Sequence, residues 1–186
     1  MTIYLIRHGK TAGNREKRYI GRTDEPLCDE GIEAIRDLKL PRCDALICSP
    51  MRRCIQTAEI LFPGQAYLVA DDLRECDFGL FEGKNYLELS GNADYQAWID
   101  SGGMLPFPEG ESPLDFRTRC VRGFQQITAE YSQCATLAFI AHGGTIMSVL
   151  EALAVPPRGY YDWLPPNGEG WKCRYDGKNI TEPERL

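Results

Sequence analysis

Residues Ile3–Gly9, with the sequence IYLIRHG, join a short apolar run to a histidine and a glycine. The same order returns at Ala138–Gly144, AFIAHGG, where a second apolar run ends in a histidine and two glycines. Apolar runs of this length are typical of strands that are buried on both faces of a parallel sheet. His8 and His142 are the only histidines of the chain. If the two strands are parallel neighbours, both imidazoles emerge at one edge of the sheet.

The rest of the chain alternates between strand-like and helix-like patterns. We expect further strands at 44–48, 66–69 and 169–175, and helices at 29–38, 51–61, 85–101, 113–131 and 144–154. Ser49 and Pro50 should cap and begin the second helix, and Ser112 should cap the fourth. This alternation predicts the α/β class, as a three-layer α/β/α sandwich with a largely parallel central sheet. The length fits a single domain that spans residues 1–186.

Composition and charge narrow the classes of function. The chain has 186 residues, of which 43% are hydrophobic and 26% charged, as in ordinary globular proteins. A net charge of −6 disfavours a broad surface for nucleic acid or membrane. The apolar N-terminus is short and ends at Arg7, and no apolar run approaches the ~18 residues of a membrane span. We therefore expect a cytoplasmic protein, monomer or homodimer, that binds neither nucleic acid nor membrane.

The eight cysteines are scattered and form no C-x-x-C pair. A metal site is therefore not expected from them. Without an export signal the thiols should be reduced, and most should be small buried hydrophobes. Cys54 directly follows Arg52 and Arg53. Nearby positive charge makes it the thiol whose pKa could be lowered.

Arginines gather at the edge of the sheet where the histidines are expected. Arg7 directly precedes His8, and Arg52 and Arg53 fall in the first turn of a helix, after the apolar run at 44–48. Cations are unfavourable at a helix N-terminus, so these arginines either point to solvent or bind an anion there. The two alternatives are equally supported for Arg52, and anion binding is favoured for Arg53. Two histidines and two or three arginines form a pocket suited to a phosphate dianion.

In this order the motifs resemble the histidine phosphatase superfamily, the phosphoglycerate-mutase-like enzymes. The similarity spans residues 3 to about 153, and the tail after Pro156 carries no matched motif. It rests on Arg7-His8-Gly9 with Thr11 and Asn14, Gly21 with Asp24, Pro26, Leu27 and Gly31, Ser49–Ala58, Leu73-Arg74-Glu75, Phe78-Gly79 with Glu82-Gly83, Pro108–Ser112 with Arg119, and Ala141–Gly144.

The resemblance implies a role for each matched position. His8 would attack phosphorus and form a phosphohistidine, and Glu75 would be the general acid, with Asp77 as the fallback. Arg7, Arg53 and His142 would clamp the transferring phosphoryl group. The substrate-binding residues would be Lys10, Thr11, Asn14, Ile20, Gly21 and Gly143. No metal or cofactor is implied, because arginine and histidine carry the positive charge, so activity should survive a chelator.

One departure from the family pattern concerns Lys10, which stands where the family usually has glutamate. The change adds a cation beside the nucleophile loop. Lys10 either favours more anionic substrates or lies outside the pocket. It removes no member of the implied catalytic set.

The resemblance leaves the activity open among three alternatives. Only about forty residues separate Glu75 from Arg119, and the family's mutases are usually longer there. A short insertion at 84–115 over the active site favours a phosphatase for a small phosphorylated metabolite over a phosphoglycerate mutase. The run at 18–27 resembles α-ribazole phosphatases of cobalamin assembly, although broad-specificity sugar-phosphate phosphatases carry similar stretches. A catalytically silent phospho-ligand module is the third alternative, and the intact catalytic set argues against it.

The segment Leu164–Gly168, LPPNG, is the last feature that the sequence singles out. Its prolines, asparagine and glycine predict a turn before the final strand. The same segment could equally cover the site.

Overall fold

A computed structural model describes all 186 residues and contains one six-stranded sheet with the strand order β3-β2-β4-β1-β5-β6. β1 and β4 are parallel neighbours, and β2 and β3 continue the parallel part. β5 and β6 form an antiparallel hairpin beside β1. The strands are β1 (Thr2–Arg7), β2 (Ala45–Cys48), β3 (Tyr67–Val69), β4 (Thr136–Ala141), β5 (Gly170–Tyr175) and β6 (Ile180–Arg185).

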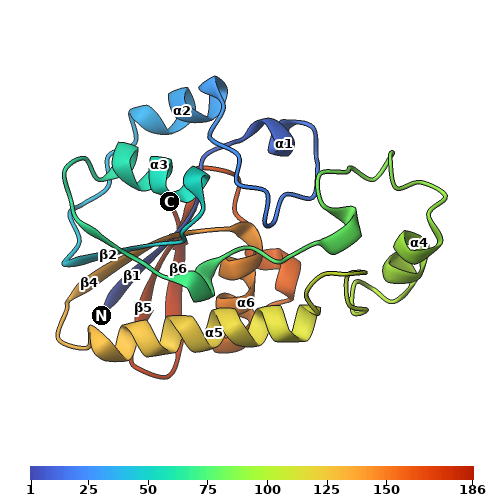
Figure 1. Cartoon of the computed structure of the whole chain (residues 1–186). Coiled ribbons are helices and arrows are strands. Elements are labelled where there is room, and N and C mark those ends of the chain that lie inside the picture. Colours follow the sequence, from blue (N-terminus) through green and yellow to red (C-terminus); the bar gives the residue numbers. More distant parts are fainter.

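Helices cover both faces of the sheet. Figure 1 shows α2 and α3 on one side and the long α5 with α6 on the other, while α4 lies on an excursion away from the sheet. The helices are α1 (Ala12–Arg15), α2 (Asp29–Arg36), α3 (Arg52–Leu61), α4 (Ala93–Asp100), α5 (Pro113–Glu130) and α6 (Gly143–Leu153), with short 3₁₀ turns η1 (Asp71–Leu73), η2 (Gly79–Phe81) and η3 (Tyr160–Trp163). The predicted three-layer α/β/α sandwich is confirmed, and the hairpin makes its sheet mixed.

The central strands are apolar throughout because both of their faces are buried. In β1, Ile3 and Leu5 pack into the core beneath α5 and α6, whereas Tyr4 and Ile6 pack into the core beneath α2 and α3. β4 alternates between the same two cores. Such strands lack the polar alternation of a half-exposed sheet. A third apolar cluster, which includes Phe81, Phe107 and Phe116, lies under the excursion.

The two long helices begin in different ways. Ser112 caps α5 as predicted, because its hydroxyl accepts a hydrogen bond from the amide of Asp115 at 3.0 Å. The predicted cap of α3 by Ser49 is wrong. That helix begins at Arg52 with Met51 as N-cap and has no side-chain cap. The hydroxyl of Ser49 is instead committed to His142, at 2.8 Å from Nε2.

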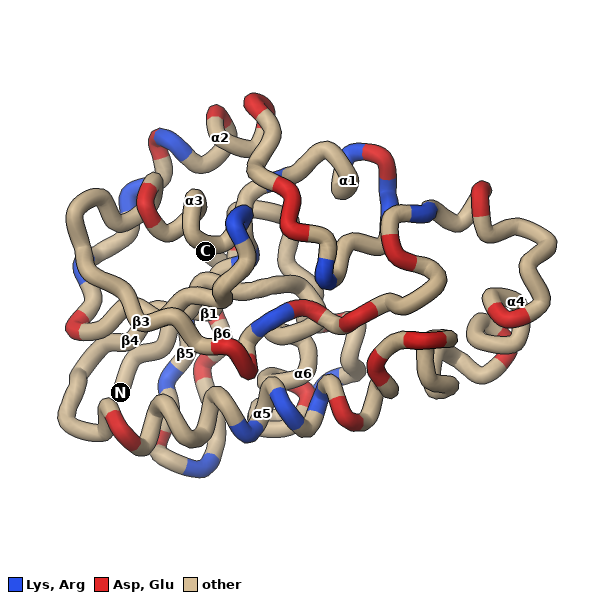
Figure 2. Tube along the Cα trace, in the orientation of Figure 1, with Lys and Arg blue, Asp and Glu red and all other residues tan.

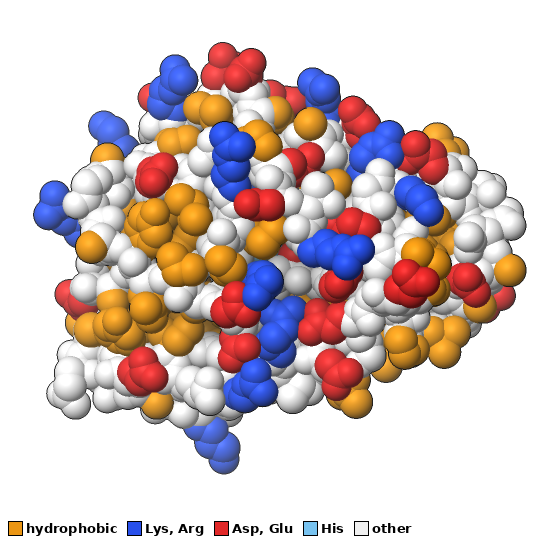
Figure 3. Space-filling view, viewed as in Figure 1, with side chains coloured by type: hydrophobic (Ala, Val, Ile, Leu, Met, Phe, Trp, Pro, Cys, Tyr) orange, Lys and Arg blue, Asp and Glu red, His pale blue; other side chains and the backbone are white.

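Charge is distributed in both signs over the molecule. Figure 2 shows Lys and Arg interspersed with Asp and Glu along the trace. The face in Figure 3 likewise mixes basic and acidic side chains across its centre. No extended single-sign surface is visible on this face. No helix of the structure is both long enough and apolar enough to cross a membrane.

Candidate active site

The register of the sheet brings the two histidines together. Arg7 pairs with Ala141 across β1 and β4, so His8 and His142 are the first residues after the two strands. The amide of His8 donates to the carbonyl of Ala141 at 3.0 Å. The two imidazole rings lie with their centroids 5.2 Å apart, at 64° to one another, and both are buried. The predicted meeting of both imidazoles at one sheet edge is confirmed.

The ring of His8 is held through one nitrogen only. Nδ1 lies 2.7 Å from the carbonyl oxygen of Gly9. A carbonyl can only accept, so Nδ1 carries the proton and Nε2 carries the free lone pair. Burial, followed by the charges of Arg53 and Arg7, holds the pKa of His8 well below its usual value. The ring is therefore neutral near pH 7 and has a nucleophilic nitrogen available.

The ring of His142 is held through the other nitrogen. Its Nε2 lies 2.8 Å from the hydroxyl of Ser49 and 3.5 Å from the thiol of Cys54. Burial, and then Arg53, lowers the pKa of this ring as well. The expectation of a lowered thiol pKa at Cys54 is wrong. The side chain is fully buried, and burial raises the pKa of the thiol to about 12 despite the opposing charge of Arg53.

Two arginines each present a buried nitrogen without a hydrogen-bond partner, Nε of Arg7 and Nε of Arg53. The guanidinium of Arg53, fully buried, donates to the carbonyls of Gly21 and Thr23, each at 2.8 Å. Arg7 donates through Nη1 to the carbonyl of Pro165 at 2.9 Å. A buried N–H that lacks an acceptor is costly, so each marks a place where an anion can bind. Both charges act on His8 and place this anion site beside its ring.

Arg52 does not share this site. Its side chain is exposed, which agrees with the alternative that Arg52 points to solvent. Its backbone amide, near the start of α3, donates to the carboxylate of Asp24. Of the two arginines in this turn, only Arg53 faces the interior.

The loop that holds Arg53 is itself fixed by Glu82. One carboxylate oxygen of Glu82 accepts from the amides of Gly21 and Thr23, at 2.8 and 2.9 Å. The carbonyls of the same two residues hold the guanidinium. Gly21 lies so close to Cys76 that a Cβ there would be 1.8 Å from its carbonyl oxygen. Glu82 belongs to one of the motifs that resemble the family, but no role was predicted for it from the sequence.

Glu75 meets the start of α6. Its Oε2 accepts from the amide of Gly144 at 3.2 Å, and its Oε1 accepts from the amide of Cys76 at 3.0 Å. Burial raises the pKa of this carboxyl above its ordinary value, against those two hydrogen bonds and the charges of Arg53 and Arg7. A carboxyl group with a raised pKa can donate a proton at higher pH than an ordinary one.

The carboxylate of Asp77, the fallback acid, does not contact the start of α6 as that of Glu75 does. Its carboxylate accepts from the amide of Gly79 at 2.9 Å and lies 3.4 Å from Arg22. It lines a polar cavity of about 290 Å³ together with Arg74 and Glu111. Glu75 lines both this cavity and the apolar one next to it.

An apolar cavity of about 330 Å³ adjoins the anion site. Arg7, Glu75 and Gly143 line it, and half of the other lining residues are aromatic. The aromatic lining residues are Tyr19, Phe78, Trp98, Phe107, Phe116, Tyr160 and Tyr161. A larger cavity of about 670 Å³, between Met1 and the end of α5, lies away from both histidines and lacks this cluster of ionisable groups.

Two stretches supply much of the aromatic wall. Trp98, Gly103 and Phe107 come from residues 84–115, the predicted insertion. Tyr160, Tyr161 and Leu164 come from the tail, which carries no motif matched to the family. Besides the segment Leu164–Gly168, the signal in the tail was its three aromatic residues Tyr160, Tyr161 and Trp163, which by themselves are equally typical of a core.

The arginine within this wall is already neutralised. Arg117 donates to Glu151 at 2.9 Å, and its guanidinium lies 3.9 Å from the ring centroid of Tyr160. Its charge is therefore shared between a carboxylate and an aromatic face. The cavity beyond the anion site thus has no free cation among its lining residues.

The tail also reaches the anion site. The side-chain amide of Asn167 donates to Oδ1 of Asn14 at 3.0 Å and to the carbonyl of His8 at 3.2 Å. Nδ2 of Asn14 is thereby directed away from that contact and can donate to a substrate. The segment Leu164–Gly168 both precedes the last hairpin as a turn and contacts the site, so the two alternatives raised by the sequence are compatible.

The other predicted substrate-binding residues are dispersed. Thr11 is buried and caps α1 by accepting from the amide of Asn14 at 3.2 Å. Lys10 is paired with Glu30 of α2, outside the cavity lining. Ile20 and Gly21 contact Arg53 through backbone carbonyls and do not line the aromatic cavity. Of this set, only Gly143 lines that cavity.

No group of three or more His, Cys, Asp or Glu side chains is arranged so that it could hold a metal ion. The chemistry available is therefore that of the neutral His8, the buried arginines and the carboxyl of Glu75. The expected independence of activity from metals stays a prediction.

Comparisons with known proteins agree with this geometry. Residues 3–182 match the model of the histidine phosphatase superfamily (branch 1). A putative phosphoserine phosphatase 2 of Hydrogenobacter thermophilus is 30% identical over 97% of this chain and 87% of its own. An adenosylcobalamin/α-ribazole phosphatase of Salmonella typhimurium is 26% identical over 84% and 81%. The crystal structure of a phosphoglycerate mutase from Thermus thermophilus superposes with a TM-score of 0.77, at 30% identity over 100% and 99%.

Proposed function

This chain belongs to the histidine phosphatase superfamily, and on that premise we propose that it hydrolyses phosphomonoesters through a phosphohistidine at His8. The observation that carries the proposal is the combination of a free Nε2 on a neutral, buried imidazole with two unpaired buried guanidinium nitrogens beside it. A phosphoryl group bound there would satisfy both nitrogens and would lie against the lone pair.

In the first step, the lone pair of His8 Nε2 forms a bond to phosphorus while the bond to the ester oxygen breaks. Arg7 and Arg53 neutralise charge on the transferring group, and His142 donates a hydrogen bond to it. Glu75 gives its proton to the leaving oxygen and becomes a carboxylate. Its place at the start of α6, on the lining of the cavity, supports this role, because the leaving group would lie in that cavity.

In the second step, water replaces the alcohol. The carboxylate of Glu75 takes a proton from the water as its oxygen attacks phosphorus, and the N–P bond breaks. The electron pair returns to Nε2, phosphate leaves, and Glu75 is protonated again. The Gly9 carbonyl accepts the hydrogen bond from Nδ1–H throughout and stabilises the positive charge of the phosphorylated ring.

The leaving group is a neutral alcohol that carries a planar, apolar part. The aromatic cavity supports this proposal, because burial of such a part removes apolar surface from water and offers ring faces for stacking. α-Ribazole 5′-phosphate has this chemistry and matches the name of one relative. Phosphoserine, in the name of another relative, carries an ammonium and a carboxylate. The neutralised Arg117 offers that carboxylate little.

Mutase activity is the alternative, since a structure named as a phosphoglycerate mutase is similar to this chain. It would require that the phosphohistidine return its phosphoryl group to a bound glycerate. Beyond the anion site, the aromatic cavity has no free cation and would hold a glycerate carboxylate poorly. A catalytically silent binding module would need neither the free Nε2 nor the raised pKa of Glu75.

The test is turnover of four substrates by the purified chain, with His8→Ala as the control. The substrates are p-nitrophenyl phosphate, α-ribazole 5′-phosphate, O-phosphoserine and 3-phosphoglycerate. We expect phosphate release from the first two in the presence of EDTA, and an acid-labile phosphoenzyme with wild type only. Equal phosphate release by His8→Ala would refute the mechanism. Preference for O-phosphoserine, or production of 2-phosphoglycerate, would refute the proposed leaving group or the hydrolase assignment, respectively.

A further inference from the structure

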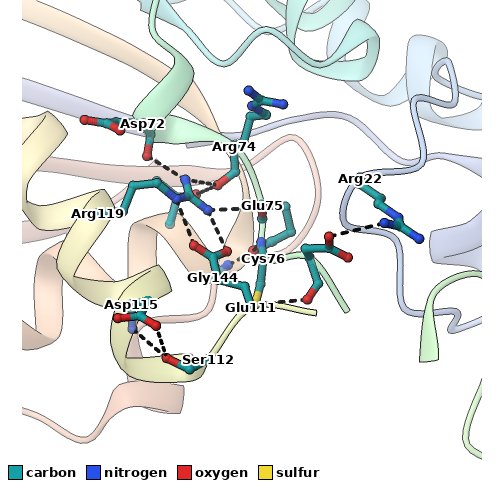
Figure 4. Close-up of polar contacts among 12 residues, drawn as sticks. Arg22, Asp72, Arg74, Glu75, Cys76, Glu111, Ser112, Asp115, Arg119 and Gly144 are labelled. Carbon is teal, nitrogen blue, oxygen red and sulfur yellow. Dashed lines mark hydrogen bonds and ion pairs between the residues drawn. The ribbon is translucent and has the colours of Figure 1, made fainter. Parts of the chain in front are cut away.

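Arg119, on α5, reaches across to the backbone of the segment that carries Glu75. Its Nη1 donates to the carbonyl of Asp72 at 2.9 Å and to that of Arg74 at 3.1 Å. Its Nη2 lies 3.5 Å from the carbonyl of Glu75 itself. Figure 4 shows the guanidinium against this stretch of main chain, with all three contacts drawn. One side chain therefore binds three of the four consecutive carbonyls from residue 72 to residue 75.

Glu111 fixes the arginine from the other side. Its two carboxylate oxygens accept from Nε and Nη2 of Arg119, at 3.0 and 2.8 Å. Both side chains are about four-fifths buried, with 21% and 20% exposed. A planar fork bound to both oxygens of a carboxylate has one orientation, unlike an exposed single-contact ion pair. The main chain of Glu111 adds to this, since its amide donates to the carbonyl of Asp77 at 2.9 Å.

The Glu75 segment needs such support because it lacks a regular element. After the single turn of η1, residues 74–78 belong to neither helix nor strand. Besides Arg119, Thr145 contacts the backbone of this segment, because its hydroxyl donates to the carbonyl of Leu73 at 3.2 Å. A loop without ladder or helical hydrogen bonds positions a side chain only as well as its tertiary contacts do.

We propose that Glu111 and Arg119 form a positioning pair that holds the carboxyl of Glu75 at the start of α6. The pair acts through the backbone of Asp72–Glu75 and touches no reacting atom. Its catalytic consequence rests on the proposed function, in which Glu75 donates a proton to the leaving oxygen. Displacement of the segment would leave phosphoryl transfer to His8 intact and would remove the proton donor from its place.

The first test separates these two effects by leaving group. Two substrates are compared in kcat/KM, which reports the step up to phosphoryl transfer. 2-Phenylethyl phosphate has a poor leaving group that needs protonation, whereas p-nitrophenyl phosphate has a good one that does not. Arg119→Met should lower kcat/KM about 10²-fold for the first and by no more than about threefold for the second. Equal losses for both substrates, or no loss for either, would overturn the proposal.

Arg122→Met is the matched control. Arg122 lies on the same helix and binds the side chain of Asp72 at 3.0 Å, but it makes no contact with the backbone of the segment. This variant removes an equal charge from nearly the same place and should leave both substrates unchanged. If Arg122→Met produced the same selective loss as Arg119→Met, the cause would be charge, and the positioning proposal would be wrong. Should Arg119→Met fail to fold, Glu111→Gln carries the same test with a smaller selective loss.

A second readout does not depend on activity. The carboxyl of Glu75 is titrated by ¹³C NMR in wild type, Arg119→Met and Arg122→Met. Release of the segment should hydrate the carboxyl and return its pKa toward the ordinary value in Arg119→Met alone, because burial is the main cause of the raised pKa. An unchanged titration would overturn the positioning role even if the enzyme were active. A shifted titration in a chain that hydrolyses neither ester would support positioning while the proposed function failed.

Discussion

His8 and His142 occupy equivalent places in the sheet and differ in the ring nitrogen that the protein holds. Each follows a buried parallel strand, and each precedes a glycine. The carbonyl of Gly9 accepts a hydrogen bond from Nδ1 of His8, whereas the hydroxyl of Ser49 forms a hydrogen bond with Nε2 of His142. Nε2 is thus free on the first ring and engaged on the second.

This difference shows how two like side chains acquire unlike roles. A carbonyl acceptor fixes the proton on Nδ1 of His8 and leaves a lone pair on the outer nitrogen. A hydroxyl can donate to Nε2 of His142, so the proton of that ring then resides on Nδ1, where it can bind an anion. The contrast supports the first histidine as nucleophile and the second as a phosphate donor.

The largest expected effect separates the two histidines by replacement. His8→Ala should lower kcat at least about 10⁴-fold and abolish the phosphoenzyme, because no nucleophile is left. His142→Ala should lower kcat about 10²- to 10³-fold, the usual loss for one transition-state donor, and still form the phosphoenzyme. Steady-state kinetics and quenched-flow labelling with a ³²P ester measure both. Labelling of His8→Ala but not of His142→Ala would reverse the two roles.

The second effect concerns stability at acid pH, to which both histidines should contribute equally. Both have lowered pKa values in the fold, so below about pH 6.5 the unfolded chain binds protons that the folded chain does not. The free energy of unfolding should therefore decrease as the pH is lowered, by up to about 1.4 kcal/mol per pH unit for each histidine. Urea titrations between pH 7 and 5.5 measure this slope.

Glu75 opposes that slope, since its raised pKa adds stability as pH falls. The titrations are therefore made in Glu75→Gln, and a His8→Asn variant of that background should show about half the slope. An unchanged slope in the double variant would mean that His8 is protonated in the fold.

A third, smaller effect tests how the His8 side is built. The hydroxyl of Thr57 accepts from the amide of Gly9 at 3.0 Å and donates to the carbonyl of Arg53 at 2.7 Å. Thr57→Val keeps the shape and leaves that buried amide unpaired, which should cost about 1–3 kcal/mol in unfolding free energy. Thr57→Ser keeps the hydroxyl and should lose less in the same urea titration. Equal stability of the valine variant and wild type would show that Gly9 is held by other means.

The smallest effect tests the His142 side. Ser49→Ala frees Nε2 of His142 and should lower kcat/KM about tenfold, or about 1.4 kcal/mol, without loss of the phosphoenzyme. Cys54→Ala is the control, because its thiol contacts the same nitrogen as a weak donor only. It should change kcat/KM by less than about threefold. A larger loss at Cys54 than at Ser49 would assign the holding of this ring to the thiol.

By itself the sequence determined the layered fold, the two strand ends with their histidines, and the basic character of that edge. These follow from local pattern, because continuous apolar runs need burial on both faces and parallel strands end together. The long helix from Pro113 with its Ser112 cap was equally readable. The sequence also brought the family into view, and with it the expected roles of His8 and Glu75.

Tertiary structure alone decided which nitrogen of each ring is free. It also decided that the hydroxyl of Ser49 contacts His142 and does not cap α3. It buried Cys54, paired Lys10 with Glu30, and built the aromatic wall from an excursion and a tail far apart in sequence. The physical reason is common to all of these. A side chain's protonation, orientation and charge depend on the groups that the fold brings against it, and most of those groups are distant in the chain.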